Sequence, residues 1–239
     1  MQREPLFNLP TVIVALLAVL TAVHGAREWL IGEDTDLWLI FTFAFVPARY
    51  DASVVPGGVL PGGFGAEIWT FVTYSLLHGS WTHLVVNAVW LMAFGSAVAR
   101  RFGTSRFMAF FAVTAAAGAV MHLVTNAGSL APMIGASASI SGAMAAAMRF
   151  AFQRGGPLGS LRGTDEESYR VPAIPLSGVW KDARVLLFLA VWFGINLLFG
   201  LGSLPITGDN EAVAWQAHIG GFLAGLLLFS WFDPKPDYP

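Results

Sequence analysis

The sequence predicts an all-α membrane protein, built as a bundle of six transmembrane helices with both termini in the cytoplasm. Composition, the number of apolar runs and the distribution of basic residues support this fold class. Of the 239 residues, 56% are hydrophobic and only 12% are charged, with a mean hydropathy of +0.64. A soluble domain carries roughly 25% charged residues, so this composition suits hydrocarbon better than water.

Six apolar runs come close to the length of about 20 residues that crosses a bilayer. They lie at residues 11–31, 76–98, 107–125, 136–152, 184–204 and 214–232. The shorter apolar stretch Leu37–Val46 predicts an interfacial or re-entrant piece. A cleaved signal peptide is the alternative for the first run, but its apolar stretch exceeds the usual 7–15 residues. Residues 11–232 are therefore predicted to form one membrane domain between short cytoplasmic tails, 1–10 and 233–239.

The basic residues predict the direction of the spans, because Lys and Arg gather in cytoplasmic loops. Eleven of the 13 fall in the tails, between the second and third spans, or in and beside a loop at 153–183. Only Arg27 and Arg49 fall on the other side. That outer side then holds a long loop at about 32–75 and short loops near 128–134 and 202–213. We expect a multi-pass integral protein of a bacterial cytoplasmic (inner) membrane.

Composition also excludes several kinds of function. The chain has no cysteine, which rules out disulfide scaffolds, thiolate nucleophiles and cysteine metal sites. The net charge is −2 and no basic patch suggests a nucleic-acid partner. The acidic cluster Asp165–Glu167 has no histidine nearby in the sequence, so we expect neither a metal nor a cofactor.

Polar residues in the apolar runs are the strongest functional signal. Ser137 lies at the head of the fourth run, and His218 lies at the head of the sixth, 81 residues later. His83 and Asn87 lie in the second run. The second, fourth and sixth spans all begin on the outer side, so all four residues should lie within about 15 Å of the outer boundary, at a rise of 1.5 Å per residue.

These residue types suit acyl transfer. A serine hydroxyl becomes a good nucleophile when a base such as neutral imidazole takes its proton. The intermediate then needs donors aimed at its oxyanion. Ser137 lies at a predicted helix N-terminus with unpaired N–H groups, and His83 and Asn87 share one helix face through their i,i+4 spacing. A serine hydrolase working inside a bilayer is the resulting prediction.

Small residues predict that the helices carrying Ser137 and His218 approach closely. The fourth run is rich in Gly, Ala and Ser, including Gly142, and the sixth contains Gly221 and Gly225 in a G-x-x-x-G pattern. Small side chains let transmembrane helices pack tightly. Such packing is needed for a serine–histidine hydrogen bond of about 2.6–3.2 Å.

Three motifs in order and register resemble those of the rhomboid intramembrane serine proteases. They are Leu-His-Gly-Ser-Trp-Thr-His-Leu-Val-Val-Asn at 77–87, Gly-Ala-Ser at 135–137, and Ala-His-Ile-Gly-Gly at 217–221 followed by Gly225. The resemblance covers roughly Glu67–Trp231 and implies a six-helix rhomboid-like bundle.

The resemblance also implies residue roles. Ser137 would be the nucleophile and His218 the base and later the acid, in a dyad without an aspartate. His83, Asn87 and the Ser137 N–H would form the oxyanion hole. The implied substrates are transmembrane segments of other membrane proteins, surrounded by lipid, with no cofactor.

Three positions depart from the family's pattern. Ala138 stands where glycine is frequent, and we expect activity to survive this smallest replacement. Thr70 follows Trp69 at a position where the first-loop motif of the family often has arginine, so the loop must be anchored by other residues. Ser141 stands where some relatives carry a tyrosine that packs on the histidine, so another group must orient His218.

Alternative interpretations remain beside this one. Taken alone, Ser137 would be a helix-packing serine, as we expect for Ser139 and Ser141, and His218 a satisfied core histidine. At the level of function, the rival is a catalytically inactive rhomboid-like protein that binds or remodels membrane clients. A transporter is less favoured, because it would show inverted repeats or broken helices.

Overall fold

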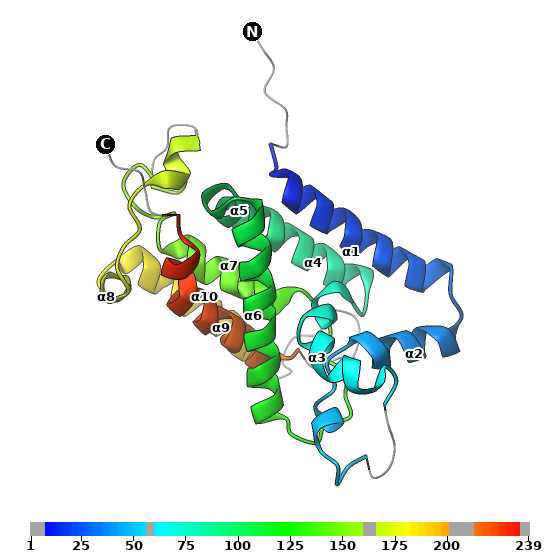
Figure 1. Ribbon diagram of the computed structural model, residues 1–239. Helices are drawn as coiled ribbons and strands as arrows, with labels where there is room; N and C mark the ends of the chain where they lie inside the picture. The colour runs from blue at the N-terminus through cyan, green and yellow to red at the C-terminus, as the bar shows by residue number, and fades with distance from the viewer. Residues whose placement is uncertain (1–7, 56–59, 160–165, 201–212, 235–239) are drawn as a thin grey trace.

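The computed structural model describes residues 8–55, 60–159, 166–200 and 213–234, and its regular elements there are helical (Figure 1). The α-helices are α1 (Thr11–Trp29), α2 (Glu33–Phe43), α3 (Gly63–Thr73), α4 (Trp81–Trp90), α5 (Ser96–Phe102), α6 (Thr104–Thr125), α7 (Ser137–Met148), α8 (Leu176–Val179), α9 (Ala183–Gly200) and α10 (Trp215–Phe232). Short 3-10 helices cover Pro47–Tyr50, Tyr74–Leu76 and Glu166–Arg170. One isolated antiparallel bridge pairs Phe45 with Met133. The all-α prediction is confirmed for this part of the chain.

Three helices in the described residues are long and apolar enough to cross a membrane: α1, the continuous Trp81–Phe102 and α6. The second of these joins α4 to α5 through a π-helical turn at Leu91–Gly95. It begins five residues later than the predicted run at 76, because the Ser80 side chain caps the helix by accepting from the His83 N–H. Apolar segments in α7 and α9 are shorter. The count of six spans stays a prediction.

The small-residue helix α7 lies at the centre of the bundle, and every residue from Ala138 to Met148 is buried. It packs between α6 and α10, and the longest stretches of contact in the fold join these three helices. Gly and Ala dominate α7, so its neighbours come close to its backbone. This packing brings the head of α7 beside the head of α10.

Charged side chains join several elements at one end of the bundle. Arg101 in α5 pairs with Asp233 beyond α10 at 2.6 Å, and Arg100 donates to the Asn8 carbonyl before α1. The start of α1 and the ends of α5 and α10 therefore share one end (Figure 1). An even number of spans requires this arrangement; the side of the membrane that this end faces stays a prediction.

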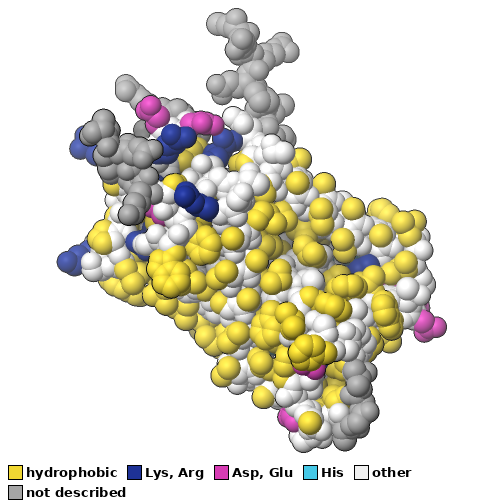
Figure 2. All heavy atoms as spheres, in the orientation of Figure 1, with side chains coloured by type: hydrophobic (Ala, Val, Ile, Leu, Met, Phe, Trp, Pro, Cys, Tyr) yellow, Lys and Arg dark blue, Asp and Glu magenta, His cyan; other side chains and the backbone are white. Residues whose placement is uncertain are grey.

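The surface between the two ends is mostly apolar. On the face seen in Figure 2, hydrophobic side chains cover the middle of the molecule, and most of the visible Lys and Arg lie towards the end that holds α5. Such a band is what hydrocarbon requires of a protein that crosses it. The apolar segments of the sequence thus form an apolar surface on this face, and most charged segments lie towards its end.

The segment predicted as an outer loop, 32–75, contains the helices α2 and α3, and α2 overlaps the apolar piece predicted at Leu37–Val46. Hydrogen bonds from side chains to backbone carbonyls join its parts. Trp69 Nε1 donates to the Thr42 carbonyl at 2.9 Å, Arg49 Nη2 donates to the Phe41 carbonyl at 2.5 Å, and the Tyr50 hydroxyl donates to the Glu67 carbonyl at 2.8 Å. Arg49, Tyr50 and Trp69 therefore anchor the segment without an arginine at position 70.

Part of the segment predicted as a loop at 153–183 packs on the bundle. Arg101 Nη1 donates to the carbonyls of Tyr169 and Val171, each at 2.8 Å, and Arg149 Nε donates to the Ile174 carbonyl at 2.7 Å. Buried guanidinium groups need such acceptors, which the chain supplies here. The predicted loop at 202–213 lies outside the described residues except for Val213.

Candidate active site

Ser137 is the first residue of α7 and is half-buried. Gly135, two residues earlier, has φ +117°, a conformation that residues with a Cβ rarely adopt. Its N–H donates to the Tyr74 carbonyl at 3.0 Å. No side chain caps the start of α7. The first N–H groups of the helix are left without intrahelical partners, and the helix dipole favours negative charge near Ser137.

His218 lies in the first turn of α10 and reaches Ser137. The distance from Ser137 Oγ to His218 Nε2 is 2.8 Å, which is a hydrogen bond between two helices. Thus the two residues that the sequence singled out lie together, although they are 81 positions apart.

Glycines on both helices permit this approach. A Cβ at Gly221 would lie 2.0 Å from the Ala138 carbonyl oxygen, and one at Gly225 would lie 2.3 Å from that of Gly142. A Cβ at Gly142 would in turn lie 3.0 Å from the Gly221 carbonyl oxygen. All three glycines named from the sequence therefore lie where the backbones of α7 and α10 meet.

The other side of the His218 ring contacts α9. Asn196 Oδ1 lies 2.7 Å from His218 Nδ1, and Asn196 Nδ2 donates to the Trp192 carbonyl at 2.8 Å. Asn196 lies in the apolar run predicted at residues 184–204. The signal available was an amide in an apolar run, which must find a partner, but the pattern does not name that partner.

The two residues expected to bind an oxyanion differ in their placement. The His83 ring lies against Gly135, because a Cβ there would be 2.8 Å from His83 Nε2 and 3.8 Å from Ser137 Oγ. Buried Asn87 instead donates from Nδ2 to the His83 carbonyl of its own helix at 3.0 Å. The structure thus places the His83 ring against Gly135, two residues before Ser137, and leaves the Asn87 amide bonded to backbone.

Residues 65–233 match the family model for the rhomboid domain. The chain belongs to the rhomboid family. It is 25% identical to rhomboid protease GlpG of Klebsiella pneumoniae over 235 residues, which cover 95% of this chain and 67% of that protein. It is 29% identical to an uncharacterized protein of Mycobacterium tuberculosis over 208 residues, which cover 84% of this chain and 75% of the other.

A plant relative also matches. RHOMBOID-like protein 5 of Arabidopsis thaliana is 26% identical over 172 residues, which cover 72% of this chain and 46% of that protein. Membership of the rhomboid family and the apolar helices show an integral membrane protein, and they support intramembrane proteolysis at the level of the family.

The structure shows what surrounds Ala138 and Ser141, two of the residues that depart from the rhomboid pattern. A Cβ at Gly118 of α6 would lie 2.6 Å from the Ala138 methyl carbon, so Gly118 makes the room that Ala138 needs. Ser141 is buried, and the side chain that contacts His218 is that of Asn196 on α9. Ser139 donates to the Phe111 carbonyl of α6 at 2.8 Å, as a packing serine does.

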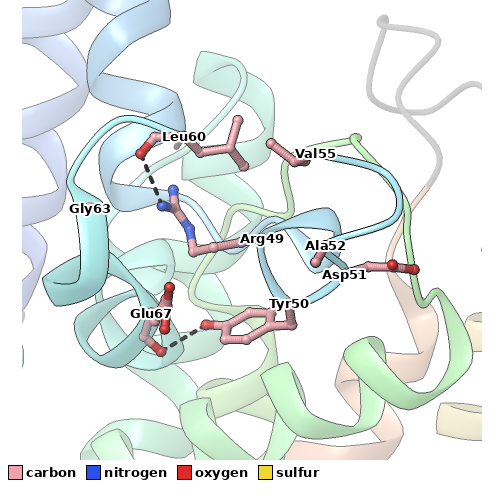
Figure 3. A pocket seen from close by; sticks show the side chains of 8 residues that line it. All are labelled: Arg49, Tyr50, Asp51, Ala52, Val55, Leu60, Gly63 and Glu67. Atoms are coloured by element: carbon pink, nitrogen blue, oxygen red, sulfur yellow. Dashed lines mark hydrogen bonds between the residues drawn. The ribbon is translucent and has the colours of Figure 1, made fainter. Parts of the chain in front are cut away.

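Within the described ranges, no group of three His, Cys, Asp or Glu side chains could hold a metal ion. A pocket of about 410 Å³ lies in the 49–67 region and is lined by neither Ser137 nor His218 (Figure 3). Two of its polar side chains bond to backbone, since Arg49 donates to the Leu60 carbonyl and Tyr50 to that of Glu67 (Figure 3).

Proposed function

We propose that this rhomboid is an intramembrane serine endopeptidase, which hydrolyses peptide bonds in or near transmembrane segments of other membrane proteins through Ser137 and His218. The observation that carries the proposal is the 2.8 Å contact between Ser137 Oγ and His218 Nε2 at the heads of α7 and α10. This is the geometry of a nucleophile with its general base.

In the first half of the reaction, Ser137 Oγ attacks the carbonyl carbon of the substrate while His218 Nε2 takes the hydroxyl proton. The negative charge on the carbonyl oxygen is stabilised by N–H groups at the start of α7, beginning with that of Ser137, and by the His83 ring beside Gly135. His218 then gives its proton to the leaving amine, and the C–N bond breaks to leave an ester on Ser137.

In the second half, His218 takes a proton from water, which attacks the ester carbonyl. The tetrahedral intermediate uses the same donors, and its collapse returns the proton to Ser137 Oγ. Asn87 joins these donors through the second hydrogen of its NH₂ group, since only one is used in the bond to the His83 carbonyl. Hydrogen bonds in a free enzyme often tighten only once substrate is bound, so this remains part of the proposal.

The substrate is a transmembrane helix that unwinds locally, because a helical peptide bond hides its carbonyl from attack. Small or helix-destabilising residues near the cleavage site would favour unwinding. With six spans and both termini in the cytoplasm, the pair would lie near the outer boundary of the membrane. Cleavage is then expected close to the outer end of the substrate helix.

The test compares purified variants on a model transmembrane substrate. Ser137→Ala and His218→Ala are expected to abolish cleavage, and a fluorophosphonate probe is expected to label the wild-type protein but not Ser137→Ala. Ser139→Ala is the matched control, since it removes a hydroxyl from the same helix that bonds to Phe111 instead. Full cleavage by Ser137→Ala would refute the mechanism, and a wild-type protein that neither cleaves nor reacts would favour a client-binding role.

A further inference from the structure

We propose that Asn196 is a positioning residue that selects the tautomer of His218 and holds its ring towards Ser137, so that the reactive unit is Ser137–His218–Asn196. This inference rests on the function proposed above. Asn196 comes from α9, a different helix from either member of the pair. The neutral imidazole must carry its proton on Nδ1 for Nε2 to accept a proton from the serine.

The hydrogen bonds of the amide fix which of its two ends faces the histidine. A backbone carbonyl only accepts, so the group that bonds to the Trp192 carbonyl at 2.8 Å must be the NH₂ of Asn196. The oxygen Oδ1 is then the atom that lies 2.7 Å from His218 Nδ1. Because Oδ1 only accepts, Nδ1 carries the proton and Nε2 presents its lone pair to Ser137 Oγ.

Packing holds this arrangement in place. The Trp192 ring stacks on Phe222 with centroids 4.2 Å apart and an interplanar angle of 28°. Trp192 and Asn196 are four residues apart on α9, and His218 and Phe222 are four apart on α10. The two helices therefore meet through two contacts one turn apart, an amide on an imidazole and an indole on a phenyl ring. This fixes the register of Asn196 against His218.

Asn196 stands out on its own helix. Its neighbours Ile195 and Leu197 are exposed, as are many of the apolar residues of α9, whereas Asn196 is 6% exposed. A buried amide in an apolar segment is costly unless both of its polar atoms are bonded, and here both are. The partner of Nδ2 is a backbone carbonyl of the same helix, whereas the partner of Oδ1 is the imidazole of His218 on α10, so the buried amide is bonded directly to the reactive histidine.

The experiment uses the full-length protein with ¹⁵N-labelled histidine, in detergent or bilayers, together with steady-state kinetics. Asn196→Ala is expected to lower kcat by about 10- to 100-fold with little change in KM, in the range seen when partners that orient a functional imidazole are removed. The ¹⁵N shifts of His218 are expected to change from the Nδ1–H form to a mixture of tautomers. Leu197→Ala, at an exposed neighbouring position, is the matched control and is expected to stay within about twofold of wild type.

A second variant separates orientation from folding. Asn196→Asp keeps an oxygen acceptor at the same place, so it is expected to retain the Nδ1–H form of His218 even where Asn196→Ala is poorly folded. The inference is overturned if folded Asn196→Ala keeps both wild-type kcat and the Nδ1–H tautomer, or if Asn196→Asp loses that tautomer. Cleavage by Ser137→Ala would instead refute the proposed function, and the tautomer would still report on Asn196.

Discussion

Replacing Gly221 by alanine tests whether the contact between α7 and α10 sets the geometry of Ser137 and His218. The new Cβ would lie 2.0 Å from the Ala138 carbonyl oxygen and 2.7 Å from its carbonyl carbon. Both are backbone atoms of α7, so no side chain can rotate away. An unstrained carbon–oxygen contact is about 3.3 Å, so the two helices must separate by about 1.3 Å at this level.

That separation acts directly on the pair, because His218 lies three residues before Gly221 in the same helix. If the head of α10 moves with it, the distance from Ser137 Oγ to His218 Nε2 grows from 2.8 Å to about 4 Å, beyond hydrogen-bonding range. A misplacement of about 1 Å can lower catalysis about 100-fold. We therefore expect Gly221→Ala to lower kcat/KM for a transmembrane substrate about 100-fold, with about 1–3 kcal/mol lost from overpacking.

The matched control is Gly194→Ala in α9, where a Cβ would meet nothing within 4 Å. Alanine favours a helix over glycine by about 1 kcal/mol, so this variant should be as stable as wild type or more so and should keep its activity. Cleavage and thermal unfolding are measured for both variants in the same detergent. Activity of Gly221→Ala within threefold of Gly194→Ala would refute the argument that backbone contact positions His218.

Three further changes test the ends and the core of the bundle. Arg101→Met leaves the carboxylate of Asp233 without its partner, so it is expected to lower the free energy of unfolding by about 3–5 kcal/mol. Denaturant titration measures this loss, and a loss below about 1 kcal/mol would contradict the prediction. Ser139→Ala removes one neutral hydrogen bond and should lose about 1 kcal/mol while retaining cleavage; loss of cleavage would show another role. The side chain of Arg184 holds the pKa of the Asp182 carboxyl below its ordinary value of 3.8, so its stabilisation is complete above that value and disappears as the pH falls through the lowered pKa. Asp182→Asn should therefore be less stable than wild type near pH 7 and should lose less stability in acid, and identical unfolding curves from pH 7 into acid would argue against it.

Much of the fold and of the candidate site could be predicted from local pattern. Apolar runs predicted helices, and the described chain is helical. Gly135 and the small residues after it predicted a helix start at Ser137, where α7 does begin. The helix α3 in the 32–75 segment was not predicted, because a helix of 11 residues leaves a weaker signal in the sequence than a full span.

Partners across helices could not be predicted in the same way. The sequence named Asn87 as a donor towards an oxyanion, and the structure shows its amide bonded to the His83 carbonyl. It found no partner for the His218 ring, and the structure supplies Asn196 from α9. Gly118 was not singled out, although it makes room for the Ala138 methyl group.

The sequence by itself determined that this is a helical membrane protein of the rhomboid kind and that Ser137 and His218 are its candidate pair, because composition, apolar length and motif spacing are local properties of the chain. Only the tertiary structure decided how near the two side chains lie, which glycines permit it, and that Asn196 contacts the histidine. In an apolar bundle, lipid-facing and buried positions have similar side chains, so the pattern does not encode the rotation and register of one helix against another. Those are set by close packing of small residues and by the few hydrogen bonds that buried polar groups require.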